Sequence, residues 1–275
     1  MRVVIPLAAL TAMLWAGEAC AAGVEIKDAV AQVTVVPEDR ADVQVVVLAG
    51  DPRLPLRVKS GRRTVIDGDL KASRIRGCGR EGGEVAVQVA GLGEIPLRRA
   101  PRIVIRTPRT VEVTVGGAVF GSIGRAVRVT LGNAGCGDWT VANVDRELKV
   151  SVAGSGDVRA GAAGAARLRV AGPGDISVGP VRGRVDVDVA GSGDVLVGSV
   201  AGPLDVNVAG SGGVTIAAGR ATAMKVTVAG SGNVEFRGVA DSLEARIAGS
   251  GDVRARRVRG PVKKAVMGAG RVIVG

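Results

Sequence analysis

Aspartate recurs at a nearly constant spacing in the second half of the chain. The column of equivalent positions reads Asp157, Asp175, Asp194, Gly213, Asn233 and Asp252. Carboxylates stacked at such a spacing could share Ca²⁺, which prefers oxygen ligands. The same side chains could instead bond nearby backbone N–H groups and shape each corner of the chain. Since Gly213 interrupts the column, we expect corner shaping, and Asp157, Asp175 and Asp194 remain weak calcium candidates.

The other residues leave little room for catalysis. The chain contains no histidine and no tyrosine, which excludes a Ser-His-Asp set and histidine-ligated zinc. Glycoside hydrolysis requires carboxylates that converge in a cleft, whereas the carboxylates here lie in regular columns. We therefore expect no enzymatic activity and no cofactor. A polysaccharide-active enzyme is the third of three alternatives.

Two cysteines of the expected mature chain could pair. Cys78 and Cys136 each stand between two glycines, a context that suits exposed tight loops. An exported protein meets an oxidising environment, so we expect one disulfide between them, with two free thiols as the alternative. The corner from Gly132 to Trp139 reads as two residues longer than the later corners, which would place Cys136 on a widened corner.

Positive charge is the remaining chemical signal. The formal net charge is +11, and it gathers in two stretches. The first lies between residues 53 and 109 and includes Arg62 and Arg63. The second comprises Arg254, Arg256, Arg257, Arg259, Lys263 and Lys264. Such fields attract polyanions in a salt-dependent way, although a solvated surface kept soluble by charge is an alternative. Nucleic acid is disfavoured because few aromatic side chains are available for base stacking.

These residues belong to a sequence repeat. Its core reads V-x-V-A-G-S-G-D-V-x-V, and its first glycine falls at Gly154, Gly172, Gly191, Gly210, Gly230, Gly249 and Gly268. The spacings are 18, 19, 19, 20, 19 and 19 residues. A fixed period of this length is typical of a solenoid in which each repeat forms one turn.

Alternation within each repeat predicts which side chains face the interior. Two residues before the glycine stand Val152, Val170, Val189, Val208, Val228, Ile247 and Val266, and six before it stand Leu148, Ala166, Val185, Leu204, Met224, Leu243 and Val262. A second strand starts four residues after the glycine, and a shorter third side carries Val181, Val200, Val239 and Val258. Since strand side chains alternate between faces, these ladders predict a roughly three-sided β-coil of about 19 residues per turn. Outward columns of mixed charge favour the same arrangement.

The chain resembles a known bacterial family. The G-S-G-D-V turns, together with the stretches 33–47 and 103–119, are similar to the auto-transporter adhesin head domains of the GIN type. The resemblance covers most of the mature chain and implies a right-handed single-stranded parallel β-helix. The family is widespread in bacterial secreted and cell-envelope proteins, and no catalytic residues come with it.

Before the regular repeats the pattern is blurred. Short alternating strands separated by turn residues are predicted between residues 23 and 100. We expect them to form irregular N-terminal turns and a cap of the same coil. Regular turns follow over 101–275, so we expect one domain over 23–275 with almost no α-helix. In the last turn Lys264 replaces an aliphatic residue and Arg271 replaces the aspartate. Charge at an open edge discourages strand pairing, yet this edge could also mediate homo-oligomers of a chain that is otherwise monomeric.

The first 22 residues read as an export signal. Arg2 precedes an apolar run, and Ala19-Cys20-Ala21 forms a small-x-small cleavage site. Acylation of Cys20 is the alternative. No later segment is long and apolar enough to span a membrane. The sequence thus predicts an exported protein of the periplasm or cell surface.

Three functions remain in order of preference. The first is a non-enzymatic binding or adhesion-type solenoid whose basic surface engages an anionic glycan, lipopolysaccharide or an anionic membrane surface. The second is a structural or stress-related envelope protein without a discrete ligand. The enzyme is the third.

Overall fold

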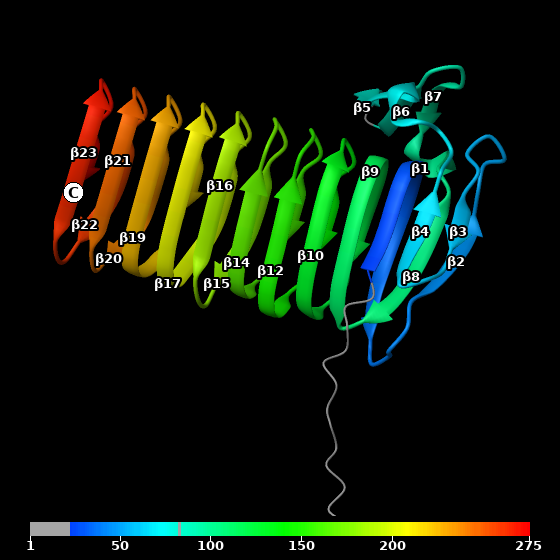
Figure 1. The fold of residues 1–275 in the computed structure, drawn as a ribbon, viewed down its shortest axis with the longest axis horizontal. Helices are drawn as coiled ribbons and strands as arrows, with labels where there is room; N and C mark the ends of the chain where they lie inside the picture. Colours follow the sequence, from blue (N-terminus) through cyan, green and yellow to red (C-terminus); the bar gives the residue numbers. More distant parts are fainter. Residues whose placement is uncertain (1–22, 82–83) are drawn as a thin grey trace, which may run out of the picture.

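The chain winds into a long coil of stacked, mainly parallel β-strands (Figure 1). The computed structural model describes residues 23–81 and 84–275. The expected export signal over residues 1–22, with Cys20, lies outside the described residues. About nine turns of about 19 residues form the coil, and no α-helix occurs in the part described. The predicted all-β parallel solenoid is confirmed.

The regular part of the coil contains sixteen strands. They are β9 (Thr110–Ile123), β10 (Ala126–Gly135), β11 (Trp139–Val141), β12 (Val144–Val152), β13 (Val158–Ala160), β14 (Ala163–Val170), β15 (Ile176–Val181), β16 (Val185–Gly191), β17 (Val195–Gly210), β18 (Val214–Ile216), β19 (Gly219–Gly230), β20 (Val234–Ala240), β21 (Leu243–Gly249), β22 (Val253–Val258), β23 (Val262–Gly268) and β24 (Val272–Val274).

Equivalent positions of successive repeats stack directly on one another. In the pairing of β16 with β17, for example, Val185 lies beside Leu204 and Gly191 beside Gly210. This register follows from the sequence because one repeat and one turn have the same length. Each inward residue thereby meets its counterpart in the next turn.

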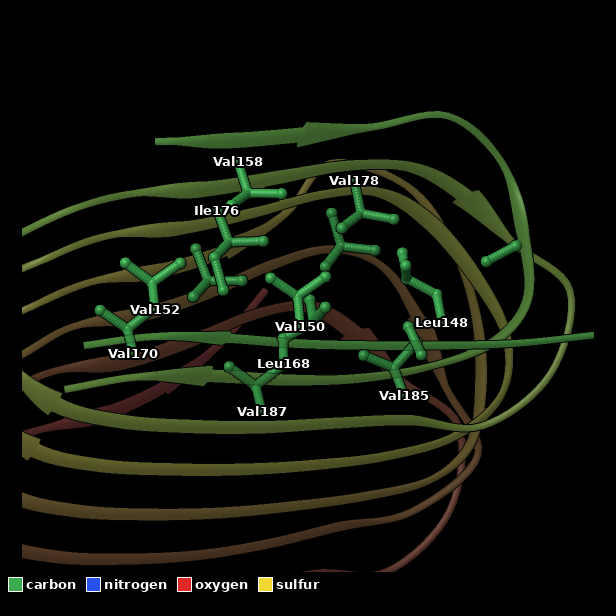
Figure 2. Close-up of a cluster of buried hydrophobic side chains, with 14 of the residues drawn as sticks. Leu148, Val150, Val152, Val158, Leu168, Val170, Ile176, Val178, Val185 and Val187 are labelled. Carbon is green, nitrogen blue, oxygen red and sulfur yellow. The ribbon is translucent and has the colours of Figure 1, made fainter. Parts of the chain in front are cut away.

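The interior is a continuous aliphatic core. Figure 2 shows its ladders in the middle of the coil, where Leu148, Val152 and Val185 are at most 1 % exposed. Full burial of such a side chain contributes about 1.5–3 kcal/mol. The predicted inward ladders are confirmed through the inner turns. Val262 and Val266 of the last described turn are 37 % and 40 % exposed, because no strand among the described residues covers them.

One member of the third ladder was assigned wrongly. Val239 is half-buried, and Ala240 occupies the fully buried place in that turn. The register between β20 and β22 shifts between Phe236 and Val239. This bulge adds one residue to β20, which a constant period could not reveal.

The N-terminal part completes the coil and covers one end of it. Its strands are β1 (Gly23–Glu38), β2 (Gln44–Ala49), β3 (Arg57–Lys59), β4 (Arg63–Asp67), β5 (Ile75–Glu81), β6 (Glu84–Val89), β7 (Gly93–Pro96) and β8 (Arg102–Pro108), with 3-10 turns at Ala72–Arg74 and Leu97–Arg99. Strand β1 pairs in parallel with β9 on one side and with β4 and β8 on the other. Strands β2 and β3 then pair antiparallel with β8 and β4.

Strands β5, β6 and β7 form a separate antiparallel sheet beside the coil (Figure 1). We call this sheet the flap. A small second core lies beneath it, in which Val87 and Ile95 of the flap pack with Val30 and Ala118 of the coil. One of the short strands that the sequence predicts between residues 23 and 100 is β6, which belongs to the flap and not to a turn of the coil.

Candidate functional site

The carboxylates of the aspartate column bind the backbone of the following turn. Asp157 Oδ1 accepts the N–H of Asp175 at 3.1 Å, and Asp175 Oδ1 accepts that of Asp194 at 2.8 Å. Asp194 Oδ1 in turn accepts the N–H of Gly213 at 2.6 Å. The sequence predicts bonds from these side chains to nearby backbone N–H groups. The structure places those groups one turn further along the coil.

The same bond recurs at further positions of the column. Asp138 Oδ1 accepts the N–H of Asp157 at 3.0 Å. The amide oxygen of Asn233 accepts the N–H of Asp252 at 2.9 Å, so the bond does not require a negative charge. Sequence reasoning missed Asp138, although the motif G-C-G-D that precedes Trp139 was its signal.

The calcium candidates are brought together, but as hydrogen-bond acceptors. Asp157, Asp175 and Asp194 line one shallow hollow together with Arg159, whose guanidinium lies 3.6 Å from the Asp157 carboxylate. Within residues 23–81 and 84–275, no three His, Cys, Asp or Glu side chains gather so as to hold a metal ion. The geometry that is present gives the column a role in joining consecutive corners.

The predicted disulfide joins Cys78 on β5 to Cys136 on a corner of the coil. The expected widening of that corner is wrong. Gly135 packs against Gly154, and Trp139 is in register with Val158, so both corners have the same length. Cys136 therefore occupies the serine position of the motif. The misreading arose because Asn133 and Trp139 stand where the other repeats carry aliphatic residues.

The polar groups of Asn133 and Trp139 have hydrogen-bond partners inside the core. The Asn133 side chain is 1 % exposed. It donates to the Gly137 carbonyl at 2.8 Å and accepts the Gly135 N–H at 3.3 Å. Trp139 donates its indole N–H to the Val119 carbonyl at 2.9 Å. Buried polar groups with such partners cost little stability, and neither of these side chains is exposed to a ligand.

Ion pairs neutralise part of the first basic stretch. Arg63 contacts Glu112, while the neighbouring Arg62 has no acidic partner within the described part of the chain. Further pairs in this stretch are Arg57 with Asp69, Arg98 with Glu84 and Arg106 with Glu38. The structure thus pairs some cations of this stretch with acids and leaves others, such as Lys59 and Arg102, exposed without an acidic side chain in ion-pair contact among the described residues.

The second basic stretch keeps its charge. We call Arg254, Arg256, Arg257, Arg259, Lys263, Lys264 and Arg271 the C-terminal basic cluster. Arg254 and Arg271 share one carboxylate, that of Asp252, at 2.8 and 3.0 Å. Hydrogen bonding from Arg271 holds the pKa of Asp252 below its usual value. The other five cations are exposed, and none has an acidic side chain in ion-pair contact among the described residues.

Charge is distributed very unevenly along the regular repeats. Residues 149–251 carry ten basic and nine acidic side chains, whereas residues 252–275 carry seven basic and one acidic. In the middle turns, basic side chains meet acids of the next turn, as Arg167 meets Asp186 and Arg169 meets Asp188. The last turns offer only one such acid within the described residues, Asp252. Net positive charge therefore accumulates at one end of the coil.

The two predicted basic stretches do not form a single surface. Arg62 and Arg63 lie at the end of the coil that carries β3 and β4, and the C-terminal basic cluster lies around β22 and β23 at the opposite end (Figure 1). Any ligand that contacts one cluster alone is therefore bound at one tip of the molecule.

The chain matches one family along nearly all of its described length. Residues 29–201 and 182–275 each match the model of the family described as "Putative auto-transporter adhesin, head GIN domain". A search of curated proteins finds no match. In the part of the chain that the structure describes, no helix is long and apolar enough to cross a membrane.

Proposed function

Because the chain belongs to the family of auto-transporter adhesin head GIN domains, we propose that it is a non-enzymatic, adhesion-type binding protein of the cell envelope. It is exported, and residues 23–275 act as one domain. The C-terminal basic cluster engages a polyanionic envelope component, either an anionic glycan, lipopolysaccharide or an anionic membrane surface. The observation that carries this proposal is the concentration of unpaired cations at one tip of the coil, next to turns over residues 149–251 whose basic and acidic side chains nearly balance.

Electrostatics supports the choice of ligand class. A Lys or Arg close to an anionic membrane surface contributes about 1 kcal/mol. Five exposed cations without acidic partners can therefore produce substantial affinity without a deep cavity. The attraction decays within a Debye length of about 8 Å at physiological ionic strength, so the binding is sensitive to salt. A rigid coil that presents this charge at its tip suits contact with an extended anionic surface.

Sedimentation with vesicles tests the proposal. Purified protein is mixed with outer-membrane vesicles, and separately with phosphatidylcholine vesicles that contain phosphatidylglycerol, at low and high salt and with calcium or a chelator. We expect binding at low salt that fades at high salt. In the double variant Arg257→Gln/Arg259→Gln the affinity falls about thirtyfold, since two charges contribute about 2 kcal/mol.

The matched control removes the same charge from the other tip. Lys59→Gln/Arg62→Gln has the same net charge, and Lys59 and Arg62 are exposed without an acidic partner among the described residues. This variant should retain most of the affinity. An equal loss in both variants would contradict a C-terminal site, and a larger loss in the control would move the site to Arg62 and Arg63. Absence of binding under every condition would favour the structural envelope protein.

A further inference from the structure

A hollow on the outer face of the last turns gathers three arginines of the coil. Its volume is about 390 Å³, and Arg237, Arg254 and Arg256 line it together with Glu235 and Ile273. These residues come from β20, β22 and β24, which lie side by side in parallel. Ile273 is 40 % exposed, so the hollow offers an apolar surface beside its cations.

The strand register explains why Arg256 has no acidic partner among the described residues. Arg254 lies beside Glu235 on the neighbouring strand, whereas Arg256 faces the bulge formed by Arg237 and Gly238. The Arg237 guanidinium donates to Glu235 at 2.9 Å, and that of Arg254 donates to Asp252 at 2.8 Å. No acidic side chain within the described residues pairs with Arg256. Arg237 and Arg256 thus lie on adjacent strands at the bulge, and Glu235 is the one carboxylate that lines the hollow with them.

This arrangement differs from the positions of the coil at which an arginine meets an acid of the next turn. Arg167 meets Asp186 and Arg220 meets Asp241 across neighbouring turns. Like charges that face each other across strands destabilise a sheet. An anion bound between Arg237 and Arg256 would relieve that repulsion. A ligand that carries negative charge would therefore be favoured in this hollow.

We propose that this hollow binds a phosphomonoester group. The assignment rests on the proposed function and names the chemistry of one subsite within it. Guanidinium groups match phosphate oxygens in a bidentate fork, and a phosphomonoester offers three acceptor oxygens and nearly two negative charges. Arg256 supplies a free fork, Arg237 and Arg254 supply their remaining N–H groups, and Ile273 contacts the carbon atoms next to the ester oxygen.

The test compares a monoester with a diester at equal surface charge. Vesicles of phosphatidylcholine with phosphatidic acid are matched in zeta potential to vesicles with phosphatidylglycerol, and the affinity ratio is measured at neutral pH. We expect phosphatidic acid to bind about tenfold more tightly. The ratio should shrink at pH 5, because the second phosphate pKa lies near 6. Inorganic phosphate, compared with chloride at equal ionic strength, tests whether the phosphate group suffices.

Matched variants separate this subsite from general attraction. Arg256→Gln and Arg259→Gln remove the same charge and both weaken vesicle binding, but only Arg256→Gln should abolish the preference for phosphatidic acid. Competition by inorganic phosphate supports a site for the free group, and a preference without competition supports a lipid headgroup. Equal affinity of the unaltered protein for both vesicles would overturn the subsite and leave the proposed function intact. Failure to bind either vesicle would overturn both.

Discussion

The aspartates of the repeat join one turn to the next. Each carboxylate reaches across to a backbone N–H of the following corner, as Asp175 reaches Asp194. A corner N–H points along the coil axis and has no strand partner of its own. Leaving such a donor unpaired costs free energy. Aspartate, or asparagine as at Asn233, supplies the acceptor, which accounts for the recurrence of the motif without a metal ion.

Asp194 gives a direct test of this role. Asp194→Ala removes the acceptor of the Gly213 N–H, and we expect the free energy of unfolding to fall by about 1 kcal/mol. Asp194→Asn keeps an oxygen in place and should lose less than half of that. Denaturant unfolding with calcium or with a chelator measures both variants. If asparagine cost as much as alanine, and calcium stabilised only the unaltered protein, the column would be a cation site.

Among the elements, the flap is the one least tied to the coil. Strands β5–β7 form no ladder with the solenoid strands, and their contacts are the small second core and the disulfide. Cys136 occupies a serine position, so serine at this site restores the sequence of the other corners. The disulfide between the flap and the coil can therefore be removed by substitution with serine without disturbing the corner of the coil.

We expect Cys78→Ser/Cys136→Ser to loosen the flap and leave the coil folded. The disulfide closes a loop of 58 residues, which on the loop-entropy model corresponds to about 4 kcal/mol. Solenoid turns interact mainly with their neighbours, so the loss should remain local. Hydrogen exchange should accelerate over residues 75–96 and stay unchanged over 144–258. Equal acceleration in both regions would show that the flap and coil unfold together.

The predictability of these elements follows from the period of the sequence. Ladders such as Val189 over Val208 could be read directly, because repeat and turn have equal length. The flap could not be predicted from the sequence in this way, since its strands carry no repeat and pair antiparallel. The bulge near Val239 and the pairing of Arg63 with Glu112 depend on local register and side-chain reach. The sequence shows that basic residues cluster near residues 254–271. Only the structure shows that most of them lack an acidic partner among the described residues.

For the whole molecule, the exposed edge strand β23 (Val262–Gly268) bears on self-association. Strand β23 is exposed along its length, and exposed strand edges can pair with other chains. Lys264 stands beside Ala245 in a column that is buried in the preceding turns. Its ammonium donates to the Val272 carbonyl at 3.4 Å. The side chain thereby places a charge over the end of the apolar core.

Lys264→Val should therefore promote association. Aliphatic side chains would then occupy the alternate positions 262, 264 and 266, and a second chain could extend the core without burying an ammonium group. Lys263→Val is the matched control, because Lys263 belongs to the outward column beside Glu244 and carries the same charge. Sedimentation velocity over a range of concentrations should show oligomers for Lys264→Val well below the concentration at which Lys263→Val forms them. Equal association of the two variants would mean that net charge alone keeps the molecules apart, and that the position of Lys264 over the core has no part in it.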